Sequence, residues 1–140
     1  MRSYIGRYKV TDVIKEKFSV GYIGESIFNK WFTSTYQDEF LIKQKADRDY
    51  DKIDFVCSKG YKYQVKCTEK KSYTFNCHKD NIEKSLTSDV YVFIQIVEGY
   101  AYIEQLRNRE YVKQNVMQSI FKNSMCYVNA ERLLQHTLKI

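Results

Sequence analysis

The sequence contains no proline and only five glycines, so it has no proline-rich or glycine-rich tract. Together with a hydrophobic fraction of 44%, this composition excludes collagen-like, low-complexity and intrinsically disordered proteins. Long hydrophobic runs are missing as well. The longest, such as residues 90–97, contain about eight residues, whereas a membrane-spanning helix needs about 20. We therefore expect no transmembrane segment.

We also expect no secretory signal, because MRSYIGRYKV lacks the apolar stretch of about 7–15 residues that such signals contain. We therefore expect a cytoplasmic protein with reduced cysteines. No two of the four cysteines have the close spacing of about two to four residues that is typical of structural zinc sites. Cys57 and Cys67 are instead expected to be small apolar core residues.

Positive charge is in excess, and it is concentrated in two blocks of the net +6 chain. Residues 59–84 carry seven basic and three acidic side chains, and residues 107–140 carry six and two. Lysines alternate with aromatic residues in the first block, a mixture that suits phosphates and exposed bases. The alternative is a solvated strand face whose aromatic residues belong to the core. The candidate nucleic-acid contacts in this block are Lys62, Lys70, Lys71, Tyr73 and His78.

Four aspartates lie within eight residues of the segment ADRDYDKIDF, which includes Asp51 and Asp54. Carboxylates this close repel one another. The segment is therefore either a solvent-exposed turn or a place where a bound cation offsets the repulsion.

The pattern of apolar residues predicts one α/β domain over residues 1–140. Apolar residues with successive spacings of four, one, three and one predict a helix over residues 22–36. The nearly continuous apolar run at 89–97 predicts a strand buried on both faces. The other predicted strands are 40–45, 53–57, 61–68 and 100–106, and the other predicted helices are 80–86, 111–121 and 130–138. The expected architecture is a mixed central sheet flanked by helices, with a core at about 21–106 and a C-terminal helical extension at 107–140.

Chemistry is predicted for the hairpin that strands 53–57 and 61–68 form around the turn at 58–60. If the apolar side chains face the core, alternation along the strands places Asp54, Gln64 and Lys66 together on the other face. A carboxylate and an amide oxygen suit Mg²⁺ or Mn²⁺, which lowers the pKa of a bound water. Lys66 is suited to orient or deprotonate that water, or to stabilise the transition state. These residue types point to metal-assisted phosphodiester hydrolysis.

The segments GYIGES, YDKIDF and YQVKCT, in this order, resemble the PD-(D/E)XK nuclease superfamily. The resemblance covers about residues 21–68 and implies an αβββαβ, restriction-endonuclease-like core. It also implies that Asp54 is the motif aspartate, that Gln64 and Lys66 form the Gln-x-Lys variant, and that Glu25 is the acid of the preceding helix. The Gln-x-Lys form resembles some restriction-type nucleases and homing endonucleases of this fold, and the small size resembles Holliday junction resolvases.

Gln64 is neutral where the more usual motif has an acid, so Glu25 or Asp51 must supply the missing negative ligand. Asp51 is also an alternative to Asp54 as the motif aspartate, but Asp54 is favoured because it lies inside the apolar strand. The resemblance implies a Mg²⁺- or Mn²⁺-dependent DNA endonuclease, which we expect to be a homodimer because a double-strand cut needs two active sites.

Two other classes of function stay open. One is a nucleic-acid-binding protein that has the same fold but no catalytic activity, and the other is a basic structural or interaction protein. The abundance of Lys, Ile, Tyr and Asn indicates an AT-rich genome, such as that of a virus or mobile element.

Overall fold

The computed structural model describes residues 4–44, 53–69, 74–78, 87–114, 116–118 and 125–129. In chain order the elements are β1 (Gly6–Lys9), α1 (Val10–Val13), α2 (Val20–Thr35), β2 (Leu41–Lys43), β3 (Phe55–Cys57), β4 (Lys62–Thr68), β5 (Thr74–His78), β6 (Val90–Val97), β7 (Tyr100–Asn108), α4 (Arg109–Gln114), β8 (Val116–Gln118) and β9 (Met125–Asn129).

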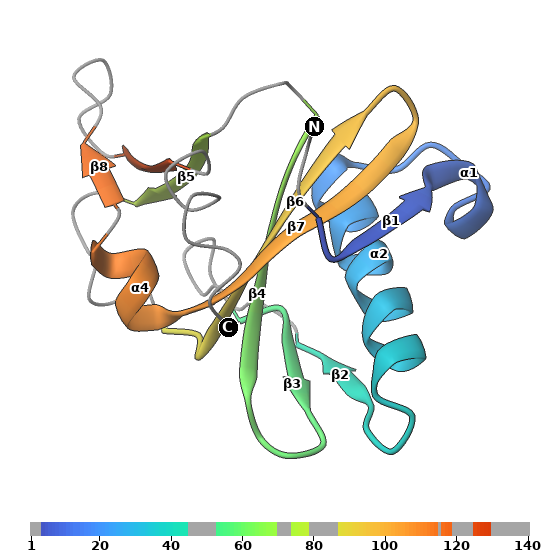
Figure 1. The fold of residues 1–140 in the computed structure, drawn as a ribbon, viewed down its shortest axis with the longest axis horizontal. Helices are drawn as coiled ribbons and strands as arrows, with labels where there is room; N and C mark the ends of the chain where they lie inside the picture. The colour runs from blue at the N-terminus through green and yellow to red at the C-terminus, as the bar shows by residue number, and fades with distance from the viewer. Residues whose placement is uncertain are drawn as a thin grey trace.

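Six of the strands form a mixed sheet in the order β1-β7-β6-β4-β3-β2. The neighbours β4 and β6 are parallel, and the other neighbouring pairs of this sheet are antiparallel. The sheet is strongly curled, so that it resembles half of a barrel (Figure 1). The described part of the chain therefore confirms the expected α/β class, with a six-stranded mixed sheet and three helices.

Helix α2 covers one face of the six-stranded sheet (Figure 1). It begins after Ser19, whose hydroxyl accepts a hydrogen bond of 3.3 Å from the Tyr22 N–H and so caps the first turn. Ile27, Phe28 and Phe32 are almost completely buried against the sheet. The expected helix over 22–36 and its apolar stripe are thus confirmed, and the main hydrophobic core lies between α2 and the sheet.

The expected hairpin is confirmed as the antiparallel pair β3 and β4. Its turn contains Gly60, whose φ of +90° is costly for a residue with a Cβ atom. The expected central strand is also confirmed, since β6 is buried on both faces along most of its length. The predicted helix over 80–86 lies outside the described residues.

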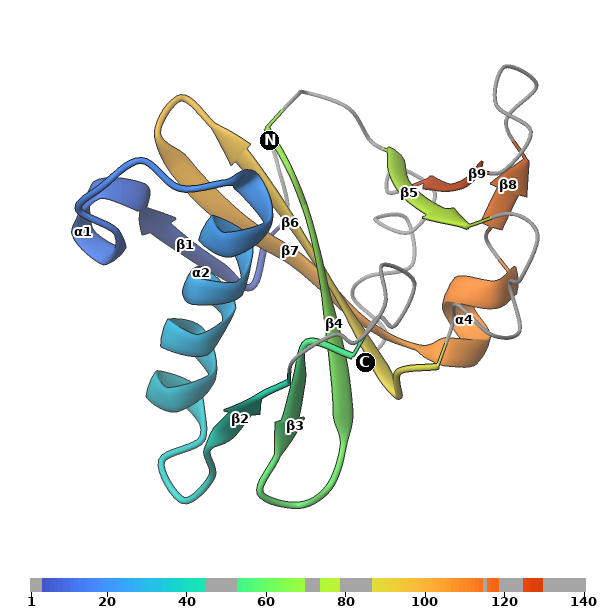
Figure 2. The ribbon, with the colours of Figure 1, turned by 180° about the vertical axis from the view of Figure 1, so that it is seen from behind.

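A second, three-stranded sheet with the order β5-β9-β8 lies on the opposite side of the six-stranded sheet from α2 (Figure 2). The prediction of a helix over 111–121 is wrong for Val116–Gln118, which forms β8, whereas α4 covers it up to Gln114. β8 gains its hydrogen bonds from β9, a partner more distant in sequence, and such pairing overrides local helix preference. The C-terminal part therefore contains strands as well as a helix, and the predicted helix over 130–138 lies outside the described residues.

Candidate functional site

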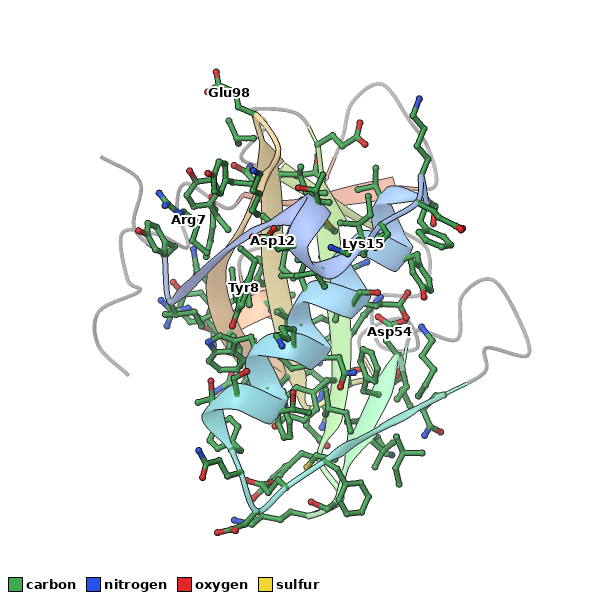
Figure 3. All side chains as sticks on the ribbon, turned by 90° about the vertical axis from the view of Figure 1, so that its right-hand side faces the viewer. Arg7, Tyr8, Asp12, Lys15, Asp54 and Glu98 are labelled. Atoms are coloured by element: carbon green, nitrogen blue, oxygen red, sulfur yellow. The ribbon has the colours of Figure 1, made fainter. Side chains whose placement is uncertain are left out.

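Asp54 immediately precedes the first residue of strand β3, at the end of the hairpin away from its turn (Figure 3). Its N–H donates a hydrogen bond of 2.9 Å to the carbonyl of Tyr63, although the register partner of Tyr63 is Phe55. Pairing is therefore irregular at this point, as it is in a β-bulge. The Asp54 carboxylate accepts a hydrogen bond of 2.7 Å from the N–H of Val65. Asp54 thus occupies the fork between the two strands, with its carboxylate against the middle residue of the Gln-x-Lys segment.

The side chains of Gln64 and Lys66 lie on the sheet face that points away from α2. Their neighbours Val65 and Cys67 lie on the opposite face, because both contact Gly24 of α2. A Cβ atom built on Gly24 would be 3.4 Å from Cγ1 of Val65 and 2.5 Å from Cβ of Cys67. Since side chains alternate along a strand, Gln64 and Lys66 share the other face.

Gln64 is a buried polar residue whose side chain is only 3% exposed. Its Oε1 atom accepts no hydrogen bond from the residues that the structure describes. Leaving a buried acceptor unsatisfied costs about 1–3 kcal/mol, so such an atom indicates a place for a ligand or water. Amide and carboxylate oxygens are donor types that Mg²⁺ and Mn²⁺ bind, so the residue types Asp54 and Gln64 fit a hard divalent cation.

Glu25 lies on the second turn of α2, on the sheet face opposite to Gln64. Its carboxylate forms an ion pair with the ammonium group of Lys43 on β2. The Lys43 ammonium also lies 5.3 Å from the centre of the Phe55 ring. Glu25 is therefore at the same end of β3 as Asp54, but it reaches this end from the α2 side.

Asp51, the second candidate for the motif aspartate, lies outside the described residues. Among the residues that are described, no three His, Cys, Asp or Glu side chains gather as a metal site. The structure therefore brings Asp54 next to the Gln-x-Lys strand and Glu25 to the same end of the hairpin. It does not bring Glu25 onto the face that carries Gln64 and Lys66.

The candidate nucleic-acid contacts are only partly described. Lys62 is exposed at the start of β4, and its N–H donates a hydrogen bond of 2.9 Å to the carboxylate of Asp89. His78 is the last residue of β5, where it pairs in register with Met125 of β9. The other three, Lys70, Lys71 and Tyr73, lie outside the described residues.

The sequence analysis missed three buried polar residues on β6 and β7, two of which, Gln95 and Gln105, lie on the same sheet face as Lys66. Gln95 and Glu104 are completely buried, and Gln105 is 1% exposed. Phe93 pairs with both Lys66 and Gln105, which places these two residues at the same level of the sheet. A register shift in the pairing of β6 and β7 leaves Glu104 as an extra residue. Two glutamines and a glutamate within the mainly apolar segments of β6 and β7 were the available signal.

Cys57 and Cys67 are confirmed as core residues on the α2 side of the sheet. Burial is the main reason that the pKa of the Cys67 thiol rises to about 12, and the nearby Glu69 carboxylate adds to the rise. Burial likewise raises the pKa of the Tyr63 hydroxyl. At neutral pH Cys67 is therefore a protonated thiol, which is a poor nucleophile.

Comparison with protein-family models and with curated proteins finds no match to this chain. No helix among the described residues is long and apolar enough to cross a membrane. The fold defines the class of this chain as an α/β protein with a curled, six-stranded mixed sheet.

Proposed function

We propose that this protein is a metal-dependent DNA endonuclease with a PD-(D/E)XK-type site at the hairpin of β3 and β4. The observation that supports the proposal best is the hydrogen bond from the N–H of Val65 to the carboxylate of Asp54. It places an acid in the fork of two strands, directly against a Gln-x-Lys segment. The same residue types in the same order are what the resemblance to this superfamily implies.

The arrangement of elements also supports the proposal. A helix, α2, is followed by the antiparallel strands β2, β3 and β4, and β6 then pairs in parallel with β4. This order agrees with the strands of an αβββαβ core, with β5 of the second sheet inserted between β4 and β6. The residues predicted for the second helix, 80–86, lie outside the described part of the chain.

In the proposed site Asp54 and the amide oxygen of Gln64 would hold a Mg²⁺ or Mn²⁺ ion, with Asp51 as a further acidic ligand. Glu25 approaches this end of the hairpin from the α2 side of the sheet. When bound, the ion supplies a more acidic water and offsets negative charge on the phosphate. Lys66 orients the attacking water or accepts its proton, and its positive charge stabilises the pentacoordinate transition state when it is protonated. The basic side chains beyond the site, such as Lys62, contact DNA phosphates.

The proposal is tested by incubating supercoiled plasmid and branched DNA with the protein and Mg²⁺ or Mn²⁺, with EDTA in parallel. We expect cleavage in both metals, none in EDTA, and a loss of at least about a hundredfold in Lys66→Ala, since a positioned acid–base group contributes about that much. Lys62→Ala is the matched control from the same strand, and its loss should be only a few-fold.

Cleavage that persists in EDTA, or that is equal in the Lys66 and Lys62 variants, would contradict the proposed mechanism.

Double-strand breaks need two sites, so we also propose a homodimer, which sedimentation of the active protein would detect.

A second candidate function is a nucleic-acid-binding protein without catalytic activity. The observation in its favour is that Gln64, which replaces the usual acid, is both neutral and buried to 3% exposure. Gel retardation of DNA without cleavage in either metal would support this function. If the protein neither retards nor cleaves DNA, the remaining class is that of basic structural or interaction proteins.

A further inference from the structure

Cys77 and Cys126 lie opposite each other in the three-stranded sheet, as register partners in the antiparallel pair of β5 and β9. Register partners have Cα atoms about 5.5 Å apart where they exchange hydrogen bonds, and about 4.5 Å apart where they do not. Disulfides join Cα atoms that are about 4.4–6.8 Å apart, so both kinds of register pair are within reach. The backbone therefore places two cysteines where one covalent bond can connect them.

The register around the two cysteines is regular. They lie inside a run of five successive register pairs, in which Asn76 pairs with Tyr127. On the other side of the cysteines, His78 pairs with Met125. β9 is also the middle strand of this sheet, because it pairs with β8 along its other edge. A slip of one residue would place the two cysteines on opposite faces of the sheet, so their pairing depends on this register.

The other two cysteines are not placed to form a disulfide with each other. Cys57 lies beside the turn between β3 and β4, where its N–H donates a hydrogen bond of 3.0 Å to the carbonyl of Tyr61. Cys67 lies six residues beyond Tyr61, which corresponds to about 20 Å along a strand. Cysteines whose Cα atoms are more than about 7 Å apart cannot be joined without movement of the backbone. Both also pack in the core on the α2 side, whereas the three-stranded sheet lies on the opposite side of the six-stranded sheet (Figure 2).

We propose that Cys77 and Cys126 are an oxidation site, at which a disulfide forms between β5 and β9 and is reversed by reducing thiols. The inference does not depend on the proposed nuclease, because neither cysteine is assigned to its site. The two residues are about 50 positions apart, so the bond closes a long loop that contains β6, β7, α4 and β8 and restricts the unfolded chain. In compartments that keep thiols reduced, such a disulfide is generally transient and redox-sensing.

Glutathione disulfide belongs to the class of oxidant that this step requires, a small-molecule disulfide. The thiolate of one cysteine attacks a sulfur atom of glutathione disulfide, whose S–S bond breaks and releases one glutathione thiolate. The thiolate of the other cysteine then attacks the protein sulfur of this mixed disulfide and releases the second glutathione. The protein thus loses two electrons and two protons, which the two glutathione thiols carry away, and excess glutathione reverses both steps.

The test treats the reduced full chain with glutathione disulfide, alkylates the remaining thiols in urea and digests the protein with trypsin under non-reducing conditions. Cleavage after Lys and Arg leaves each of the four cysteines in a different peptide, with Cys77 in 72–79 and Cys126 in 123–132. We expect mass spectrometry to find these two peptides joined, from a protein that migrates as a monomer. Cys57 and Cys67 should be alkylated, and dithiothreitol should separate the joined peptides.

Serine variants identify the two partners. Cys77→Ser and Cys126→Ser should each abolish the joined peptides and leave one glutathione bound to the remaining cysteine. Cys57→Ala is the matched control, because it removes a thiol outside the pair and should leave the joined peptides unchanged. Oxidation should also raise the urea midpoint of the wild type and of Cys57→Ala, but not that of Cys77→Ser.

The inference is overturned if the native protein forms no joined peptides, if Cys77 and Cys126 are joined only between two copies of the chain, or if another pair of cysteines is the main product. It is also overturned if the chain oxidised in concentrated urea contains the same proportion of this disulfide as the native protein, because the pairing would then not depend on the register of β5 and β9.

Discussion

Asparagine in place of Asp54 is expected to reduce Mg²⁺-dependent DNA cleavage by more than about a hundredfold. Substituting residues that only hydrogen-bond to a metal ligand already costs about 10- to 100-fold, and Asp54 is proposed to be a ligand itself. The substitution preserves the shape of the side chain, and the amide oxygen of asparagine is still able to accept the hydrogen bond from the N–H of Val65. What it removes is the negative charge, which is the property that a divalent cation requires. Initial rates of plasmid nicking at fixed Mg²⁺ measure the effect.

Asp89→Asn provides a closely matched control for this experiment. Asp89 also accepts a backbone hydrogen bond from β4, from the N–H of Lys62 at 2.9 Å. The two substitutions therefore disturb the same strand in the same chemical way, but only Asp54 is assigned to the metal. We expect Asp89→Asn to cleave DNA within a few-fold of the wild-type rate, with an unchanged far-ultraviolet circular dichroism spectrum.

Two results would contradict the assignment of Asp54. Cleavage by Asp54→Asn at the wild-type rate would show that its carboxylate is not a required ligand, and Asp51 would then be the aspartate to substitute. Equal losses in Asp54→Asn and Asp89→Asn would show that the effect comes from the strand rather than from the metal.

The parts of the fold that local pattern determines were predicted well. The stripe on α2 follows the helical period, so its residues Ile27, Phe28 and Phe32 were identified before their burial was known. The nearly continuous apolar run of β6 and the turn at 58–60 are local signals of the same kind. Each of these features depends on residues within a few positions of one another.

The features that were missed depend on distant partners. The N-terminal strand β1 pairs with β7, which follows more than 90 residues later in the chain, and β8 is a strand because β9 lies beside it. Neither pairing can be recognised from the residues that lie next to β1 or β8 in the chain. Val116–Gln118 was therefore assigned to a helix on its spacing alone, although it pairs with another strand.

The candidate site was predictable in composition but not in geometry. Alternation along β4 places Gln64 and Lys66 on one face, and the contacts of Val65 and Cys67 with α2 agree with this. The position of Asp54 does not follow from alternation, because its N–H bonds to Tyr63 at an irregular point of the hairpin. The contact of Glu25 with Lys43 depends on how α2 packs against β2, which no short motif specifies.

Alanine in place of Gly24 is expected to lower the free energy of unfolding by about 1–3 kcal/mol, the usual cost of overpacking a core. The new Cβ atom would be 2.5 Å from Cβ of Cys67 and 3.0 Å from its Sγ atom. A Cβ atom is fixed to the backbone, so rotation of the cysteine side chain cannot relieve the first contact. Helix α2 must instead move away from β4, which also moves Glu25, the residue that follows Gly24.

Gly21→Ala is the matched control in the same helix. Gly21 is exposed, and a Cβ atom there has no other atom within 4 Å. Alanine is therefore expected to stabilise the protein by up to about 1 kcal/mol through its higher helix propensity. Urea denaturation followed by the fluorescence of Trp31, the single tryptophan of the chain, measures both variants. Equal stability of the two would mean that α2 does not lie against β4 at Gly24, and it would remove the basis for placing Glu25 at the end of β3.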